Sequence, residues 1–294
     1  MACDAPAPAG GATTAVRAEL PPPGPWLRRL RPGPVRPVAG RVVCFPHAGG
    51  GAGTYRPLAT AVAAAARAAD TRPYETLAVQ YPGRHDRIAE ARLETLSELA
   101  AGAHQALRPL LDRPLTLLGH SMGALVAYET ARLLERDGTP PAHLVVSGAW
   151  APDRVPGGTV HLRDDDAVVD EIRRIQGTDP RLLADRGVLA PALPVVRSDY
   201  KAVETYRHRP GPPLTTPVTA LVGDSDPLVG VDQAAAWRDR TTAAFRLRTF
   251  PGGDHFYLNR HWPEVAEHLV GTGLADGRGT GQPAARSQPA ARSR

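Results

Sequence analysis

The sequence predicts an α/β fold in which a mostly parallel sheet is covered by helices on both faces. Short apolar segments alternate with helical patterns through the middle of the chain, as in sheets whose strands are buried on both sides. One apolar segment ends at a Gly-x-Ser-x-Gly turn that leads into a helical pattern. The chain has 294 residues, of which 42% are hydrophobic, so it can bury the core of such a domain.

The expected elements follow one another along the chain as strand and helix in turn. The expected strands are Arg41–Phe45, Glu75–Gln80, Leu115–Leu118, His143–Ser147, Val218–Val222 and Phe245–Phe250. The expected helices are Tyr55–Ala69, Leu93–Leu111, Ala124–Arg136, Val231–Arg240 and Pro263–Val270. Because strands and helices alternate through this part of the chain, we expect one domain over residues 24–271.

Two kinds of segment interrupt or flank this domain. Residues 151–213 break the strand–helix rhythm and contain helical patterns of their own, so we expect a helical lid over the site; a structural decoration away from the site is the alternative. Residues 1–23 have low complexity, and residues 272–294 contain a tandem Gln-Pro-Ala-Ala-Arg-Ser repeat. We expect both ends to be disordered.

The turn Gly119-His-Ser-Met-Gly123 matches the nucleophile elbow of the α/β-hydrolase fold. In such an elbow a serine sits in a strained strand-to-helix turn, and glycines on both sides leave room for the neighbouring backbone. The following helix points its free amides at the serine. Ser121 is therefore the expected nucleophile, and a plain strand–turn–helix corner is the alternative.

A serine hydroxyl needs a base and a residue that orients the base. In this fold the acid and then the histidine follow the serine in the chain. Asp226 lies three residues after the glycine that ends the strand at 218–222, so we prefer it to the competing Asp224, which suits a turn. His255 follows the last strand, in a loop where doubly wound sheets place their ligands, and is the expected base.

Backbone amides are the expected oxyanion hole. One donor should be Met122, directly after the nucleophile, and the other should come from the loop after an early strand. That loop is Pro46-His-Ala-Gly-Gly-Gly51, in which we prefer the Ala48 amide to that of Gly49. The glycines could instead cradle a phosphate, but the loop lacks the Lys-Ser/Thr of a P-loop and the spacing of a dinucleotide fingerprint.

Composition excludes several other classes of protein. The net charge of +5 arises at the ends, since residues 1–38 contain five arginines and two acids and residues 272–294 contain four arginines and one acid. The near-neutral remainder disfavours nucleic-acid binding. The chain has two cysteines, and we find neither a signal-peptide pattern nor an apolar run that could span a bilayer. We therefore expect a soluble cytoplasmic protein without a disulfide framework.

Five motifs in order resemble the type II thioesterases that accompany polyketide synthases and nonribosomal peptide synthetases. The motifs are Cys44-Phe-Pro-His-Ala-Gly-Gly50, Tyr81-Pro-Gly-Arg84, Gly119-His-Ser-Met-Gly123, Ser147-Gly148 with Ala151-Pro152, and Gly253-Asp-His-Phe-Tyr-Leu258. The resemblance covers residues 25–270. It departs from the family at Gly51 and Leu58, and at Asp254, which stands between Gly253 and His255 where the family often has Gly-Gly-His.

The resemblance implies a stand-alone hydrolase that cleaves acyl thioesters from the phosphopantetheine arm of carrier proteins and so clears stalled or mis-primed synthases. It implies the same catalytic groups: Ser121, Asp226, His255 and the amides of Ala48 and Met122. No metal or organic cofactor is expected, since the pantetheine belongs to the substrate. The expected partners are acyl or peptidyl carrier proteins, and we expect a monomer that binds neither nucleic acid nor membrane.

Three other functions remain open at this point. The same triad serves carboxylesterases acting on oxygen esters and acyltransferases in which an alcohol or amine replaces water. A non-catalytic partner that docks on a synthase is the third. Because carrier proteins are typically acidic, an arginine patch is expected beside the pocket, and its candidates are Arg84, Arg87, Arg154, Arg197 and Arg207.

Overall fold

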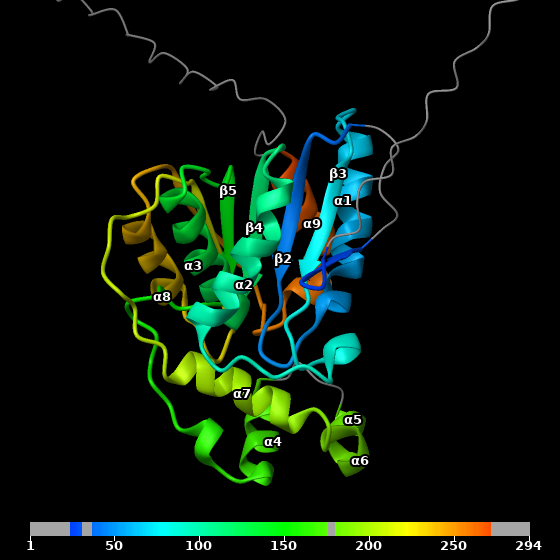
Figure 1. Cartoon of the computed structure of the whole chain (residues 1–294), viewed down its shortest axis with the longest axis vertical. Helices are drawn as coiled ribbons and strands as arrows, with labels where there is room; N and C mark the ends of the chain where they lie inside the picture. The colour runs from blue at the N-terminus through cyan, green and yellow to red at the C-terminus, as the bar shows by residue number, and fades with distance from the viewer. Residues whose placement is uncertain (1–23, 31–36, 176–179, 272–294) are drawn as a thin grey trace, which may run out of the picture.

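In the described part of the chain, seven strands form one sheet in the order β1-β3-β2-β4-β5-β6-β7 (Figure 1). The computed structural model describes residues 24–30, 37–175 and 180–271. Strand β1 pairs antiparallel with β3, and every other neighbouring pair is parallel. The strands are β1 Leu27–Arg29, β2 Gly40–Phe45, β3 Tyr74–Val79, β4 Leu115–His120, β5 His143–Ser147, β6 Val218–Gly223 and β7 Phe245–Phe250.

Helices connect these strands. The α-helices are α1 Arg56–Ala68, α2 Leu96–Leu107, α3 Met122–Arg136, α4 Asp165–Arg174, α5 Pro180–Ala184, α6 Arg186–Leu189, α7 Leu193–Glu204, α8 Val231–Ala235 and α9 Leu258–Gly271. Short 3-10 helices lie at Ala52–Tyr55, His85–Arg87, Arg108–Leu110, Val160–Leu162 and Ala236–Arg240. None of the helices in the described part of the chain is long and apolar enough to cross a membrane.

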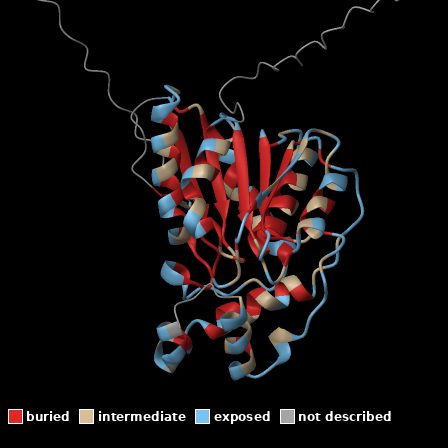
Figure 2. Ribbon diagram, turned by 180° about the vertical axis from the view of Figure 1, so that it is seen from behind, coloured by how far each residue is buried: buried red, intermediate tan, exposed pale blue. Residues whose placement is uncertain are grey.

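The sheet is buried on both faces, as Figure 2 shows. Apolar side chains of α2 and α3 pack on one face, and those of α1 and α9 pack on the other. Strands β2 to β6 are buried along their whole length. Burial on both faces explains why their sequences are mainly apolar. The predicted α/β-hydrolase fold, with its mostly parallel sheet, is therefore confirmed.

The six predicted strands are present with ends shifted by two residues at most, and four other elements differ from the prediction. Strand β1 was not predicted, because it has only three residues, two of them arginines. The last helix begins at Leu258 rather than Pro263, with a kink at His261 where the backbone φ is −123°, because Pro263 cannot continue a regular helix from the preceding turn. Two short helices, α5 and α6, were also not predicted.

Residues 151–213, which we call the helical insertion, lie between β5 and β6 beyond the carboxyl ends of the strands (Figure 1). Helix α4 begins after Asp164, whose side chain accepts a hydrogen bond from the Ala167 amide; the three consecutive aspartates therefore cap the helix and fill its first turn. The insertion has a small apolar core of its own, formed by Val168, Leu183, Leu189, Leu193 and Val196.

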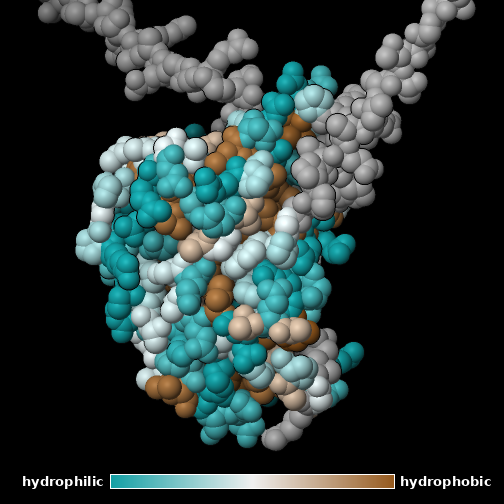
Figure 3. Space-filling model, viewed as in Figure 1, coloured by the Kyte–Doolittle hydropathy of each residue, from teal (hydrophilic) through white to brown (hydrophobic). Residues whose placement is uncertain are grey.

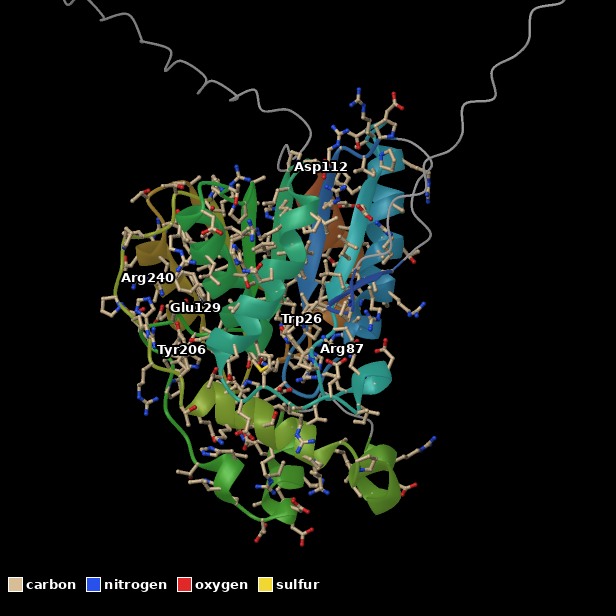
Figure 4. The ribbon with its side chains drawn as sticks, in the orientation of Figure 1. Trp26, Arg87, Asp112, Glu129, Tyr206 and Arg240 are labelled. Carbon is tan, nitrogen blue, oxygen red and sulfur yellow. The ribbon has the colours of Figure 1, made fainter. Side chains whose placement is uncertain are left out.

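The chain leaves the insertion along α3. Tyr206 Oη donates a hydrogen bond of 2.6 Å to Glu129, and these two residues are labelled in Figure 4. Farther on, the amides of Thr215 and Thr216 both donate to the carboxylate of Glu135, also on α3. The return path of the insertion is thus fixed to the helix that follows the Gly-x-Ser-x-Gly turn.

The outer surface is mainly polar. The face seen in Figure 3 carries hydrophilic side chains among which hydrophobic ones are interspersed. Among the described residues, the exposed large hydrophobic side chains are Ile88, Leu162 and Leu247. The two predicted disordered ends, 1–23 and 272–294, lie outside the described residues.

Candidate active site

Ser121 stands at a strained turn between β4 and α3. Its φ is +54° and its ψ is −124°, a conformation that is unusual for a residue other than glycine. Its amide donates to the Ser147 carbonyl at 2.8 Å, which ties the turn to the neighbouring strand β5. A Cβ at Gly119 would lie 2.2 Å from the Gly123 oxygen, and one at Gly123 would lie 2.0 Å from the Phe45 oxygen. Both positions therefore require glycine, as expected for a nucleophile elbow.

His255 and Asp226 form a buried pair. His255 Nδ1 lies 2.8 Å from Asp226 Oδ2, and both side chains are almost fully buried. The other carboxylate oxygen of Asp226 accepts hydrogen bonds from the amides of Leu228 and Val229. The carboxylate is thereby fixed by the backbone and orients the imidazole through Nδ1, leaving Nε2 for chemistry.

Asp224 lies in a different environment. It is exposed, and its Oδ1 accepts hydrogen bonds from the Gly252 amide at 2.7 Å and from the Ser225 hydroxyl at 3.1 Å. The structure thus brings Asp226 to the histidine and uses Asp224 to join two loops. Asp254, beside the base in the sequence, forms an ion pair with Arg260 at 3.1 Å.

Ser121 and His255 line a cavity of about 650 Å³ together with Ala48 and Met122. Met122 is the first residue of α3, so no carbonyl of its own helix can accept from its amide. The Gly49 amide donates to Asp199 Oδ2 at 2.7 Å and is therefore already engaged. This leaves Ala48 as the better candidate in the loop after β2.

The rest of the cavity is largely apolar and is shared between the core and the insertion. Leu125 and Trp150 contribute from the core, and Ile172, Val196 and Val203 contribute from the insertion. The insertion also brings the ion pair of Glu171 with Arg174 to the wall. Such a space suits a hydrophobic chain attached to a polar reacting group.

Two further imidazoles, those of His120 and His47, pack beside the base, and for His120 we expect a packing role. The His120 ring centroid lies 4.9 Å from that of His255, and its Nδ1 is 3.0 Å from Ser147 Oγ, which in turn is 2.6 Å from Tyr257 Oη. Burial lowers the pKa of His120 well below its ordinary value, and it lowers the pKa of His47 to about 4. Both rings are therefore neutral near pH 7, and His255 is the imidazole placed beside a carboxylate.

Two of the five arginines expected beside the pocket are not at the surface, whereas Arg207 is exposed. Arg84 and Arg87 are buried, with exposed fractions of 4% and 6%. Arg84 pairs with Asp199, and Arg87 packs on the Trp26 ring at 5.0 Å (Figure 4). Their guanidinium groups are held inside because each has buried acceptors, which a sequence pattern does not reveal. Arg154 and Arg197 are partly exposed and pair with acidic residues.

Asp199 of α7 is the main residue of this region that sequence reasoning missed. It is fully buried and contacts the loop after β2. Because it stands in a helical pattern two residues after Arg197, the sequence suggests a solvent-exposed acid. Among the described residues no group of three or more His, Cys, Asp or Glu side chains could hold a metal ion.

Comparisons with known proteins agree on one family. The sequence model of the thioesterase domain family matches residues 40–271. The thioesterase PikA5 of Streptomyces venezuelae is 46% identical over 263 residues, which are 87% of this chain and 89% of that protein. The solved structure of the type II thioesterase BorB from the borrelidin biosynthetic cluster is 44% identical, with a TM-score of 0.75 over 85% of this chain and 97% of that one. RedJ, a thioesterase from the prodiginine pathway of Streptomyces coelicolor, is 36% identical, with a TM-score of 0.73 over 80% of this chain and 90% of that one.

Proposed function

The chain belongs to the thioesterase family, and from that premise we propose that it is a type II thioesterase that hydrolyses acyl thioesters on the phosphopantetheine arm of carrier proteins. Its role is to clear stalled or mis-primed polyketide or nonribosomal peptide synthases. Support comes from relatives named as type II thioesterases of such pathways. The observation that carries the chemistry is the buried Asp226–His255 pair beside a strained serine in one apolar cavity.

The proposed reaction has two steps. In the first, Ser121 Oγ attacks the thioester carbonyl while His255 Nε2 accepts its proton, and Asp226 keeps the proton of Nδ1 in place. The amides of Met122 and Ala48 stabilise the oxyanion. His255 then protonates the departing pantetheine sulfur, leaving an acyl-serine. In the second step a water activated by His255 releases the acid and restores the serine. The protein's own groups supply each of these proton transfers.

The helical insertion is proposed to be the lid of this site. It supplies roughly half of the cavity wall, including Ile172, Val196 and Val203, and would cover the acyl chain while leaving the thioester at the strand ends. The unit that performs the reaction is proposed to be the domain over residues 24–271, acting as a monomer. Cys44 is a free and buried thiol, which suits a cytoplasmic setting.

The test uses a holo carrier protein loaded with acetyl, propionyl and longer acyl groups, with loss of each thioester followed by intact mass. We expect the wild-type protein to remove the acyl groups and Ser121→Ala to lose at least about 10³-fold in rate. The same acyl groups on a soluble oxygen ester are the comparison. Turnover of the oxygen ester alone would replace the proposal with an esterase. Turnover of neither substrate would contradict catalysis and favour a docking role.

A further inference from the structure

A buried ion pair joins the helical insertion to the loop that carries the proposed oxyanion donor. Arg84 Nη2 donates to Asp199 Oδ1 at 2.6 Å, and the two side chains have exposed fractions of 4% and 0%. Arg84 follows β3 in the core, whereas Asp199 lies in the middle of α7. A pair of charges removed from water is costly unless the geometry is good and the remaining hydrogen-bonding groups are satisfied.

The loop after β2 supplies further hydrogen-bond partners to this pair. Asp199 Oδ2 accepts from the Gly49 amide at 2.7 Å, and Arg84 Nη1 donates to the Gly50 carbonyl at 2.9 Å. The same loop is closed by a hydrogen bond of 2.9 Å from the Gly50 amide to the His47 carbonyl. The ion pair is therefore hydrogen-bonded to two successive residues of a tight turn, to the amide of Gly49 and to the carbonyl of Gly50.

The same turn also lies against α7 at Gly49. Gly49 has a φ of +75°, and a Cβ on it would lie 2.9 Å from a side-chain carbon of Val196, which also belongs to α7. The insertion thus rests directly on Gly49. Because the Gly49 amide belongs to the peptide group that begins with the Ala48 carbonyl, fixing its direction restricts the orientation of the preceding residue. The direction of the Ala48 amide is set by the same turn.

We propose that Asp199 is a positioning residue for the oxyanion hole, so that the Ala48 amide points at the reacting oxygen only while α7 is seated on the loop. This inference rests on the proposed function. It makes the insertion part of the catalytic apparatus as well as a wall of the cavity. When α7 lifts, Gly49 loses its acceptor, Arg84 loses its counter-ion, and the turn is free to rotate its amides. Burial raises the pKa of Asp199, while Arg84 and the Gly49 amide act against this shift.

The experiment compares Asp199→Ala and Asp199→Asn with wild type on the acyl-loaded carrier protein. We expect kcat to fall about 30- to 100-fold in Asp199→Ala while KM changes less than threefold, since the loss concerns the transition state. Asp199→Asn keeps an acceptor for Gly49 but loses the charge, so its kcat should lie between the two. Binding of a trifluoromethyl ketone that mimics the tetrahedral intermediate should weaken in proportion to kcat/KM, whereas binding of the product acid should not change.

Two further variants separate positioning from simple stability. Arg173→Ala removes an exposed ion pair with Asp170 on α4, within the insertion, and should keep kcat within twofold. The double variant Arg84→Met with Asp199→Leu replaces the ion pair by apolar groups, which often preserves stability. We expect its unfolding midpoint to approach that of wild type while its kcat stays low.

The outcomes are distinguishable. If the wild type hydrolyses the carrier-bound thioester and Asp199→Ala, or the stable double variant, keeps its kcat within twofold, Asp199 has no positioning role and the proposed function stands. A fall in kcat without weaker binding of the trifluoromethyl ketone would also overturn the inference. If the wild type itself is inactive, the proposed function fails and this inference fails with it.

Discussion

The strand ends of the core and the helical insertion both supply residues to the same cavity, but they hold those residues differently. In the core, Ser121, Asp226 and His255 each follow a parallel strand of the sheet, and their conformations are set by neighbours in the sheet and in adjoining loops. In the insertion, Asp199 reaches its place through the packing of a whole helix on the core. Core residues are therefore fixed by local geometry, whereas insertion residues depend on how the insertion is seated.

The largest effect should come from breaking the core arrangement. Asp226→Asn keeps the size of the side chain but favours the wrong tautomer of His255, so we expect the kcat for thioester hydrolysis to fall about 10⁴-fold. Asp224→Asn, two residues away on an exposed turn, is the matched control and should stay within twofold of wild type. The measurement is steady-state hydrolysis of an acyl-loaded carrier protein. Equal losses in the two variants would remove Asp226 from its proposed role.

The second largest effect concerns the pH dependence of folding stability, which should differ between the core and the helical insertion. Burial lowers the pKa of His143, at the start of β5, to about 4. The unfolded imidazole titrates near pH 6.5, so as pH falls the unfolded state binds a proton first and stability is lost between about pH 6.5 and pH 4. This one group should cost about 2 kcal/mol of folding free energy at pH 5 relative to pH 7.

Urea unfolding at pH 7 and pH 5 measures this difference. His143→Gln keeps a polar group near Thr219 and should reduce the loss by about 2 kcal/mol. His208→Gln is the matched change where the chain leaves the insertion; because His208 is only partly buried, it should alter the pH dependence much less. If His143→Gln and His208→Gln changed the pH dependence of stability equally, the loss would not be due to His143.

The smallest effect should come from the insertion wall. Ile172→Trp fills part of the cavity at α4, so kcat/KM for a long acyl group should fall about tenfold while that for acetyl stays within twofold. Asp170→Trp places the same side chain on an exposed position of the same helix and should change neither. The ratio of long-chain to acetyl turnover is the quantity to measure. An unchanged ratio in Ile172→Trp would show that the acyl chain does not reach α4.

The same contrast explains what the sequence could predict. The parallel strands and the residues after them follow from local signals: an apolar run, a glycine that permits a turn, and a reactive side chain placed just beyond it. The edge strand β1 gave no such signal, because it is short and pairs with a distant segment. Asp199 gave none either, since its burial comes from Arg84, 115 positions away in the chain. Residues so far apart in the sequence come together only in the folded chain, so no local sequence motif predicts their contact.

The return path along α3 has a consequence for building chimaeras of this enzyme. Because β5 and β6 are parallel neighbours, the insertion must also carry the chain back along the length of the sheet. It does so while bonded to Glu129 and Glu135 of α3. A foreign insertion grafted between Gly148 and Thr216 would keep the Thr216 hydrogen bonds to Glu135, but it would have to bring a donor for Glu129 in place of Tyr206 and an acid for Arg84. The boundaries of an exchangeable insertion are thus set by Arg84, Glu129 and Glu135, which remain in the host protein.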